Sequence, residues 1–394
     1  KNICKIKLEN KKGLKLCEKV GKCGGCNIHV TSYEEQSENK VKKVKELCKQ
    51  QLNKNIKIND IIKMQNPYNY RNKGKYVFAE NKLKQVSMGF FEEGTHKVVY
   101  VNNCMIQDEE INEIASYVFK LVKEYNIKPY NEDKQKGFLR HLIVRKAIYT
   151  QEVMVILVTT NEKIQKREEI IRKLISKFKN IKTIVQNINS DKTKVILGTK
   201  NYNLFGNGYI TDYIDNLKFK ISPLSFYQVN PIQTQILYNK AIELAKLTGK
   251  EVVYDLYSGI GTISLIASKH AKKVYGIEVV KDAVKDSIEN AKINKIKNVN
   301  FMAGRVEYIL PRICSNETAD VVFVDPPRSG LDEKTIQTLL KIKAKKIVYI
   351  SCNPVTLFEN LKELSKYYSI KEIQPVDMFP WTDHVECCAL LCRK

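Results

Sequence analysis

Short apolar segments alternate with helical ones from residue 221 to the end of the chain, and this alternation is the strongest constraint on its fold. Strands that alternate with helices predict a parallel, doubly wound sheet, because each helix must return the chain across a sheet face before the next strand begins. A helix is expected from the N-cap pair Asn230-Pro231 to about Leu247, since proline is tolerated where its missing N–H is not needed. The strands that follow are expected at residues 251–256, 273–278, 299–302, 320–324 and 346–351.

The last two apolar runs, residues 370–378 and 385–391, are joined by a short loop that contains proline. A short connection favours an antiparallel pair, which we expect at the edge of the parallel sheet. This ending suits a sheet that binds a nucleoside methyl donor better than one that binds a dinucleotide.

Residues 65–220 have a different pattern, in which β-rich runs dominate. Adjacent strands with short turns predict an antiparallel α+β domain. We therefore expect an α/β protein in three parts: a cysteine-rich segment with a Lys-rich helix (1–64), this antiparallel domain (65–220) and a Rossmann-like doubly wound domain (221–394). The central strands are expected at residues 84–91, 138–149 and 152–160, and the central helices at 108–125 and 162–178.

A glycine turn follows the first strand of the doubly wound region, in the run Asp255-Leu256-Tyr257-Ser258-Gly259-Ile260-Gly261. Glycine suits this place because a residue without Cβ lets the backbone approach a ligand closely. A dinucleotide fingerprint would have a third glycine where Ser264 stands, so NAD is not favoured. The next strand ends at Glu278, whose carboxylate can accept hydrogen bonds from ribose hydroxyls. These features predict an adenosine site; the alternative is a packing glycine beside a surface glutamate.

Three further motifs lie where strands are expected to end, which is where open α/β sheets bind their ligands. Asp325 precedes two prolines, a pattern that is frequent in methyltransferases acting on flat nitrogen groups. Cys352 follows the strand at 346–350, so its thiol is expected at the mouth of the same cleft. Glu386 opens the last strand and, taken alone, is either an exposed cap or a base held in the cleft.

A thiol at this position has a specific chemical use. Carbon 5 of uracil is a poor nucleophile, but a thiolate that adds to carbon 6 makes carbon 5 enolate-like, so that it can attack a methyl sulfonium. A base must then remove the carbon-5 proton so that the thiol can leave. The structural alternative is a buried cysteine that packs as a small hydrophobe.

The chain carries a formal net charge of +24, which favours a polyanionic partner and above all nucleic acid. The positive excess is greatest in the first two thirds, which are expected to grip that partner. No stretch approaches the about 18–20 consecutive apolar residues of a membrane span, and no signal peptide is recognisable, so we expect a cytoplasmic protein without a membrane partner. Nothing in the sequence indicates an obligate protein partner.

Eleven cysteines in a cytoplasmic protein favour a metal or catalytic role over disulfides, because that compartment keeps thiols reduced. Cys17, Cys23 and Cys26 lie within ten residues, and the glycines between the last two let the backbone wrap around a bulky centre. Iron–sulfur clusters commonly take four thiolates, with short spacings and a distant fourth. Zinc accepts similar ligands, so the spacing alone leaves a structural zinc site open.

Taken in order, these motifs closely resemble bacterial RNA uridine C5-methyltransferases. The resemblance implies that Cys352 is the nucleophile and that Glu386 is the proton-removing base. It places Gln228, Tyr257, Glu278 and Asp325 around S-adenosylmethionine and the target uracil, with Phe226 close to the flipped base. The segments that carry it are Phe226-Tyr227-Gln228-Val229-Asn230-Pro231, the glycine turn, Asp325-Pro326-Pro327-Arg328, Ser351-Cys352-Asn353-Pro354 and His384-Val385-Glu386.

The resemblance also bears on the metal and on the substrate. It implies a [4Fe–4S] cluster whose fourth ligand is Cys104, and leaves Cys48 as a packing residue of the Lys-rich helix, which is expected to pack on the catalytic domain. It favours 23S rRNA as substrate; the alternatives are a tRNA uridine C5-methyltransferase and a non-catalytic iron–sulfur protein that binds RNA. Many members carry an OB-like domain before the cysteines, whereas 16 residues precede Cys17 here, so this module is either absent or lies outside this sequence. RNA grip is then expected from the Lys-rich first segment and the central domain.

Overall fold

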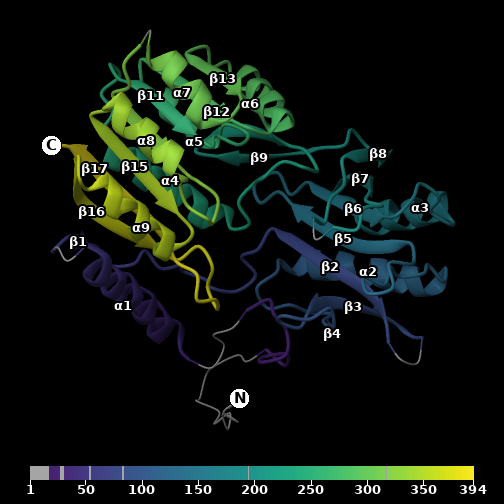
Figure 1. Ribbon diagram of the computed structural model, residues 1–394. Helices are drawn as coiled ribbons and strands as arrows, with labels where there is room; N and C mark the ends of the chain where they lie inside the picture. The colour runs from purple at the N-terminus through teal and green to yellow at the C-terminus, as the bar shows by residue number, and fades with distance from the viewer. Residues whose placement is uncertain (1–16, 27–30, 53–54, 82–83, 194, 316) are drawn as a thin grey trace.

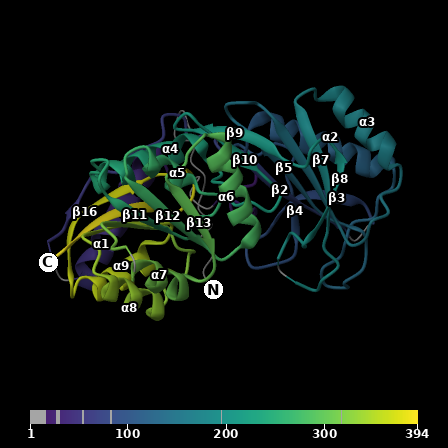
Figure 2. The same cartoon turned by 90° about the horizontal axis from the view of Figure 1, so that it is seen from above.

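The computed structural model describes residues 17–26, 31–52, 55–81, 84–193, 195–315 and 317–394, so the first sixteen residues of the expected cysteine-rich segment lie outside it. The described chain forms two large sheets that lie side by side (Figure 1). A two-stranded hairpin of β9 (Ile210–Ile214) and β10 (Leu217–Ile221) runs between them. Helices flank both sheets when the molecule is seen from above (Figure 2).

The larger sheet has eight strands in the order β1-β16-β17-β15-β14-β11-β12-β13. Strands β11 to β15 are parallel, as predicted. Strand β17 is antiparallel to both β15 and β16, which confirms the expected antiparallel pair at the end of the chain. The strands are β11 (Val252–Leu256), β12 (Lys273–Glu278), β13 (Val299–Ala303), β14 (Val321–Val324), β15 (Lys346–Ser351), β16 (Tyr368–Val376) and β17 (Glu386–Arg393).

Helices cover both faces of this sheet, which confirms the doubly wound arrangement. One buried cluster contains residues of α4, α5 and α6, and the other contains residues of α1, α7, α8 and α9. Helix α4 begins as predicted, because the Asn230 side chain accepts a hydrogen bond from the Gln233 N–H and Pro231 occupies the first turn. The helices are α4 (Pro231–Ala245), α5 (Thr262–Ser268), α6 (Lys281–Ile293), α7 (Val306–Cys314), α8 (Glu333–Ile342) and α9 (Pro354–Leu364).

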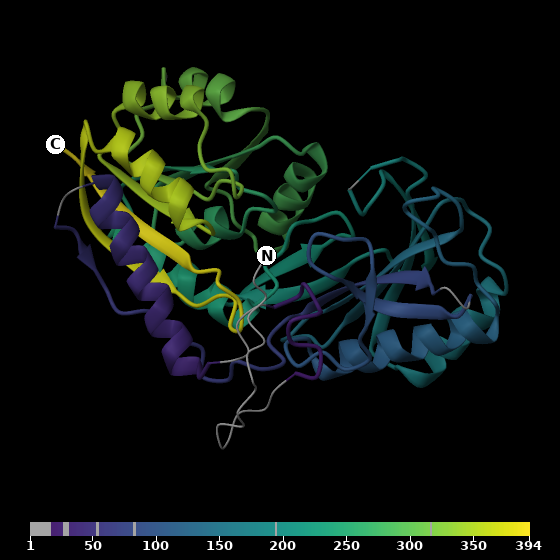
Figure 3. The ribbon, with the colours of Figure 1, turned by 60° about the horizontal axis from the view of Figure 1, so that its bottom comes forward.

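The N-terminal helix α1 (Tyr33–Leu52) packs on the sheet of the C-terminal half and lies along α9 and the last strands (Figure 3). Its residues Val44, Cys48 and Leu52 are buried in the core of that half, and β1 (Lys57–Ile58) pairs in parallel with β16. The expected packing of the Lys-rich helix and the packing role of Cys48 are thus confirmed. Among the residues that the structure describes, no helix has the length and apolar character needed to cross a membrane.

The central part of the chain forms a seven-stranded sheet in the order β4-β3-β2-β5-β6-β7-β8. Its neighbouring strands are antiparallel except for β6 and β7, which are parallel. The prediction of a purely antiparallel domain is wrong at this pair, because helix α3 returns the chain across the sheet before β7 begins. Helices α2 and α3 cover one face (Figure 3). The elements are β2 (Lys73–Glu80), β3 (Val86–Phe91), β4 (Val98–Tyr100), α2 (Glu109–Glu124), β5 (Leu139–Lys146), β6 (Val153–Thr159), α3 (Arg167–Lys177), β7 (Ile181–Ile188) and β8 (Lys200–Phe205).

The opposite face of the seven-stranded sheet is part of the core of the C-terminal half. Ile143 of β5 and Ile156 of β6 lie in one buried cluster with Phe219 of the hairpin and Leu237 of α4. Apolar burial of this kind stabilises the arrangement of the two sheets as well as each sheet by itself. Residues on facing elements of the two sheets therefore keep fixed positions relative to one another.

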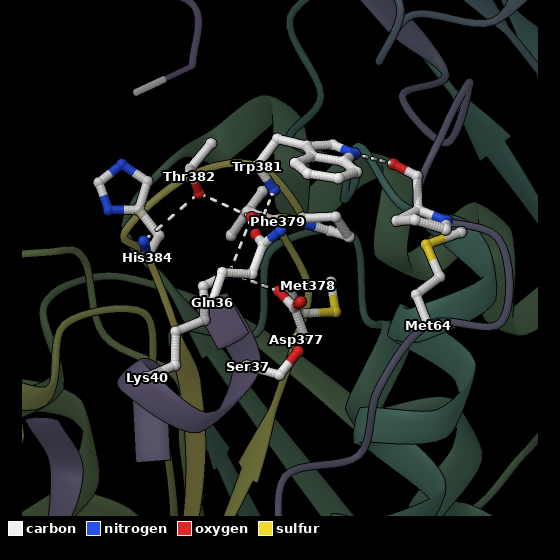
Figure 4. A network of polar contacts seen from close by, with 12 residues as sticks. Gln36, Ser37, Lys40, Met64, Asp377, Met378, Phe379, Trp381, Thr382 and His384 are labelled. Atoms are coloured by element: carbon white, nitrogen blue, oxygen red, sulfur yellow. Dashed lines mark hydrogen bonds and ion pairs between the residues drawn. The ribbon is translucent and has the colours of Figure 1, made fainter. Parts of the chain in front are cut away.

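Buried polar contacts hold the loop between β16 and β17, residues 377–385, to the N-terminal helix (Figure 4). Lys40 of α1 donates to the Asp377 carboxylate at 2.7 Å, and the two side chains are only 2% and 0% exposed. Trp381 donates its backbone N–H to the Gln36 side chain at 2.8 Å. The loop that leads into β17 is thus fixed by a helix from the other end of the sequence.

Replacing Lys40 by methionine is expected to lower the free energy of unfolding by about 3–5 kcal/mol, because it leaves the Asp377 carboxylate buried and unpaired. Urea unfolding followed by circular dichroism measures this change. Adding Asp377→Asn removes the stranded charge and should restore part of the loss. The matched control is Lys57→Met, at the exposed pair with Glu372, which should change stability by about 1 kcal/mol or less. A Lys40→Met effect no larger than the control would contradict the assigned role.

Candidate active site

The glycine turn after β11 and the end of β12 form one hydrogen-bonded unit. Glu278 accepts hydrogen bonds from the backbone N–H groups of Gly259 at 3.0 Å and of Val280 at 2.8 Å. Each carboxylate oxygen keeps a lone pair, so Glu278 can still accept hydrogen bonds from a ribose. A Cβ on Gly259 would point into open space, whereas a Cβ on Gly261 would come within 2.7 Å of the Phe301 ring. The turn therefore leaves room for a ligand beside Glu278.

Ser264 has a structural role at the position where a dinucleotide site would have glycine. Its hydroxyl donates to the Asp255 carboxylate at 2.5 Å, and Asp255 is fully buried. The other oxygen of Asp255 has no hydrogen-bond partner among the described residues. Burial raises the pKa of Asp255 to about 7, although the Ser264 hydrogen bond acts in the opposite direction.

Cys352, Asp325 and Glu386 lie at the same edge of the sheet, on three neighbouring strands. Burial raises the pKa of Glu386 to about 8, with a further contribution from the charge of Asp325, whose own pKa burial raises to about 7. Burial, followed by the charges of Glu386 and Asp325, raises the pKa of the Cys352 thiol to about 11. At neutral pH the resting site thus holds a protonated thiol and a largely protonated Glu386. Cys352 is partly exposed, unlike Cys387 and Cys388, which are buried in the core.

Arg328 is a cation that faces this acidic group, and its charge lowers the pKa of Cys352. Its guanidinium lies 3.2 Å from Nδ1 of His384, the residue two positions before Glu386. The Asn353 side chain donates to the backbone carbonyl of Arg328 at 3.1 Å and also caps helix α9. The residue after Cys352 therefore connects the Asp-Pro-Pro-Arg motif to the cysteine loop.

Gln228 reaches the same region through Tyr238, a buried residue of α4. Burial raises the pKa of Tyr238, and so does the nearby charge of Asp325, whereas hydrogen bonds with the side chains of Thr262 and Gln228 lower it. The Tyr238 hydroxyl thus connects the segment before α4, the first turn of α5 and the acidic edge of the sheet. Gln228 is therefore held by Tyr238, which lies near Asp325.

Tyr257 and Phe226 are placed in different ways. Tyr257 follows β11 with a φ of +66°, which is uncommon for a residue other than glycine, and its hydroxyl lies 3.5 Å from the Thr335 hydroxyl. Phe226 is 69% exposed, so its ring can stack on a base brought by a substrate. The roles expected for these two residues remain predictions.

The turn that presents Phe226 is held from both sheets. Arg145 of β5 is fully buried and donates to the backbone carbonyls of Ser222 at 3.4 Å and of Ser225 at 3.1 Å. Asp286 of α6 accepts hydrogen bonds from the hydroxyls of the same two serines, at 3.1 and 2.6 Å. The central sheet and the methyl-donor half therefore share the positioning of this turn.

The predicted metal ligands Cys17, Cys23, Cys26 and Cys104 lie near one another. Burial raises the pKa of Cys23, Cys26 and Cys104, and the charges of neighbouring thiols raise it further, whereas Arg71 lowers it. The backbone N–H of Gly25 donates to the Cys23 sulfur at 3.4 Å. Within the described parts of the chain, however, no three His, Cys, Asp or Glu side chains are arranged so that they could hold a metal ion. The four thiols are gathered here without being arranged around a metal.

The motifs named from the sequence thus supply the nucleophile, base and donor-loop candidates at one edge of the sheet. Sequence reasoning missed Tyr238, Arg145 and Asp286, which act through contacts between distant segments and carry no local signature. Arg328 and His384 belong to motifs that were recognised in the sequence. Their place in these motifs was the only sequence feature that could have indicated their roles.

Comparisons with known proteins agree with this geometry. A family model described as tRNA (uracil-5-)-methyltransferase matches residues 32–311 and 312–394. An uncharacterized RNA methyltransferase from Caldanaerobacter subterraneus subsp. tengcongensis is 47% identical over 380 residues, covering 96% of this chain and 84% of the relative. Another from Clostridium acetobutylicum is 44% identical over 384 residues, covering 96% and 83%. The crystal structure of Pyrococcus abyssi tRNA (uracil-54, C5)-methyltransferase in complex with S-adenosyl-L-homocysteine has a TM-score of 0.77 at 28% identity, covering 94% of this chain and 86% of that one. The chain belongs to the tRNA (uracil-5-)-methyltransferase family and is an S-adenosylmethionine-dependent RNA methyltransferase.

Proposed function

We propose that this enzyme methylates carbon 5 of a uridine in 23S rRNA through a covalent bond between Cys352 and carbon 6 of the uracil. The observation that carries the proposal is the meeting of a partly exposed thiol with two buried carboxyl groups, Asp325 and Glu386, at the ligand-binding edge of a parallel sheet. A thiol that only packs in a core has no need of such neighbours.

The donor loop fits S-adenosylmethionine. Glu278 is fixed by two backbone N–H groups beside the open space at Gly259, where a nucleoside can lie with its ribose hydroxyls toward the carboxylate. We assign Gln228, Tyr257 and Asp325 to the remainder of the donor and uracil site. S-adenosylmethionine supplies an electrophilic methyl group when it is bound.

In the first step, the Cys352 thiol gives its proton to solvent water, and the resulting thiolate bonds to carbon 6 of a flipped-out uracil. The electron pair of the carbon 5–carbon 6 double bond then forms the bond from carbon 5 to the methyl group, while the methyl–sulfur bond of the donor breaks. Arg328 favours the thiolate, because its charge stabilises the anion. Phe226 is exposed where it can stack on the uracil.

In the second step, Glu386 removes the proton from carbon 5. The electron pair of that bond restores the double bond, and the bond from carbon 6 to Cys352 breaks, which frees 5-methyluridine and a thiolate. A base with a pKa of about 8 both takes and releases protons near neutral pH, as general base catalysis requires. Asp325 contributes to that value by its charge.

The choice of RNA rests on the cysteine cluster, because the methyltransferases with this cluster that the chain resembles act mostly on large-subunit rRNA. A tRNA substrate is the second candidate, since the Pyrococcus abyssi relative is a tRNA (uracil-54, C5)-methyltransferase. The high net charge supports an RNA partner of either kind.

Incubating the full chain with methyl-labelled S-adenosylmethionine and separate pools of protein-free 23S rRNA and tRNA distinguishes the two. We expect label in 23S rRNA, recovered as 5-methyluridine after nuclease digestion. Label in tRNA alone would overturn the rRNA assignment and leave the chemistry intact.

Replacing Cys352 by alanine is expected to abolish labelling while RNA binding persists, whereas Glu386→Gln should trap an RNA–protein adduct that survives a denaturing gel. A fully active Cys352→Ala enzyme would refute the mechanism.

The pH at which Cys352 becomes reactive should be raised by one substitution and lowered by another. Burial and nearby carboxylates raise the pKa of the Cys352 thiol to about 11. The rate of Cys352 alkylation by iodoacetamide should therefore rise as the pH approaches that value. Arg328→Met removes a stabilising cation and shifts the profile to higher pH. Glu386→Gln removes a charge that is present above a pH of about 8, and shifts it to lower pH. Mass spectrometry of the Cys352 peptide measures the pH profile of each variant. The control is Lys341→Met, a charge change far from Cys352. Identical profiles in all variants would contradict the assigned effects of Arg328 and Glu386 on the thiol.

We also propose that Cys17, Cys23, Cys26 and Cys104 hold a [4Fe–4S] cluster. The donor set fits in its chemistry: four thiols, backbone hydrogen bonds to the sulfurs of Cys23 and Cys104, and the Arg71 cation, which favours thiolates. A [4Fe–4S] cluster takes four thiolates, and these four thiols supply that number, whereas a structural zinc site is the alternative that the same ligands allow.

Protein purified without oxygen is therefore expected to be brown and to contain iron and inorganic sulfide. Cys104→Ala should lose most of the iron, because it removes one of the four thiolates. Cys48→Ala is the matched control, since Cys48 is buried in another core and should leave the iron content unchanged. Colourless protein with stoichiometric zinc would refute the cluster.

A further inference from the structure

A cavity of about 860 Å³ lies on the central sheet, away from the glycine turn after β11. Residues of β2, β3 and β5 form its walls together with the loops beyond them and Gly24 of the cysteine segment. Its volume falls within the about 300–1,000 Å³ that pockets for small ligands have. His141 lines it and lies two residues from Ile143 on β5, so the cavity shares the sheet face that joins the C-terminal half.

A buried ion pair makes one wall rigid. The Arg140 side chain is 1% exposed and donates three hydrogen bonds to the Glu132 carboxylate, at 3.1, 3.1 and 3.3 Å, and others to the backbone carbonyls of Asn189 and Asp191. Its guanidinium also lies 4.6 Å from the centre of the Tyr130 ring. The charges of Arg140 and Glu132 satisfy one another, so this pair shapes the cavity and leaves recognition of a ligand to other groups.

His141 is a cavity residue with one ring nitrogen unpartnered among the described residues, since its Nε2 atom lies 4.0 Å from the Glu132 carboxylate and its Nδ1 atom is free. It is 95% buried, and its Nδ1 atom has no hydrogen-bond partner among the described residues. Burial, with the charges of Arg140 and Lys75, lowers the pKa of His141 to about 4, so the imidazole is neutral at physiological pH. A buried polar atom without a partner is costly, and a ligand that supplies a hydrogen bond removes that cost.

The lining also contains two further carboxylates, Glu92 and Glu93, together with cations and aromatic rings. Lys75 and Lys192 are exposed side chains of the cavity, and no carboxylate among the described residues forms an ion pair with either. Phe91 and His96 contribute adjacent rings, with centroids 5.7 Å apart. Unpaired bases stack on aromatic side chains and hydrogen-bond through their edges, while lysines contact the phosphates.

The same sheet face leads from this cavity to the turn that presents Phe226. Lys73 pairs across the strands with Arg145, which donates to that turn, and Lys73 also lacks a carboxylate partner among the described residues. His141 and Arg145 are four residues apart on β5, or about 13 Å at the usual rise of a strand. The cavity and the turn that presents Phe226 are therefore linked by one strand, on which Ile143 lies between them and is buried in the core.

We propose that this cavity binds an unpaired nucleotide of the RNA molecule whose uridine is methylated, with His141 hydrogen-bonded to the base and Lys75 and Lys192 against its phosphates. The inference rests on the proposed function for the identity of the RNA. It adds a second point of recognition, which helps to select one uridine among many.

The test compares Lys75→Ala, His141→Leu and His141→Gln with Lys341→Ala as a charge-matched control on the other half of the molecule. Anisotropy of a short fluorescein-labelled oligouridylate measures affinity at several salt concentrations, and methylation of protein-free 23S rRNA gives KM and kcat. We expect Lys75→Ala to weaken binding about 3- to 10-fold and to flatten the salt dependence by about 0.7 in slope. His141→Leu should raise KM for RNA about 10-fold with kcat nearly unchanged, and His141→Gln should recover most of that loss because it keeps a hydrogen-bonding group.

Lys75 is exposed, so its variant tests the cavity even where His141→Leu fails to fold. Values for both variants equal to those of Lys341→Ala would overturn the proposal, as would an effect on double-stranded RNA alone. If the wild-type chain forms no 5-methyluridine in any RNA pool while oligouridylate binding still depends on Lys75 and His141, the proposed function fails and the nucleotide pocket stands.

Discussion

The buried ion pair between Lys40 and Asp377 is the interaction on which the catalytic edge of the sheet depends. Two charges with almost no exposed side-chain surface have lost most of their hydration, and only a close contact with further hydrogen bonds offsets that loss. Both are present, since the Lys40 ammonium lies 2.7 Å from the carboxylate and also donates to the Phe379 carbonyl. The same loop holds Trp381 at a φ of +67°, a strained conformation that persists only where the surroundings determine it strongly. Because Glu386 begins the strand that follows this loop, the ion pair also fixes where the Glu386 carboxyl group lies.

Burial at that edge has an electrostatic consequence. Asp325, Glu386 and the Cys352 thiol are all protonated more readily than in water, so the resting enzyme does not present a free thiolate. A cationic sulfonium placed beside these groups favours their charged forms, and Arg328 supplies the permanent part of the same positive potential. Donor binding and loss of protons are therefore coupled. A thiol that is activated only beside its co-substrate is protected from other electrophiles and from oxidation.

The strands of the C-terminal half were predictable from the sequence because each is a continuous apolar run bounded by breaking residues. The predicted ranges 273–278 and 346–351 match β12 and β15 to the residue. The direction of β7 was not predictable in this way, since the alternation of apolar residues is the same in parallel and antiparallel strands. Arg145 shows why part of the site could not be predicted from the sequence. In the sequence it is one of several cations on a β-strand, whereas in the structure it is fully buried and contacts a turn that lies far along the chain. Local patterns find catalytic motifs, whereas the residues that position them depend on the packing of distant segments.

The cysteine segment is remote in sequence from Cys352, but it contacts both the loop before Glu386 and the wall of the central cavity. Cys26 and Cys104 pack in one apolar cluster with Trp381, on the loop that leads to the base. The Gly24 N–H donates to the carbonyl of Phe91, on the wall of the central cavity. Residues 17–26 bury little apolar surface of their own, so thiol ligation would supply the constraint that hydrophobic packing does not. A metal centre in this place would act by fixing the Trp381 loop and the cavity wall relative to each other, which requires no transfer of electrons.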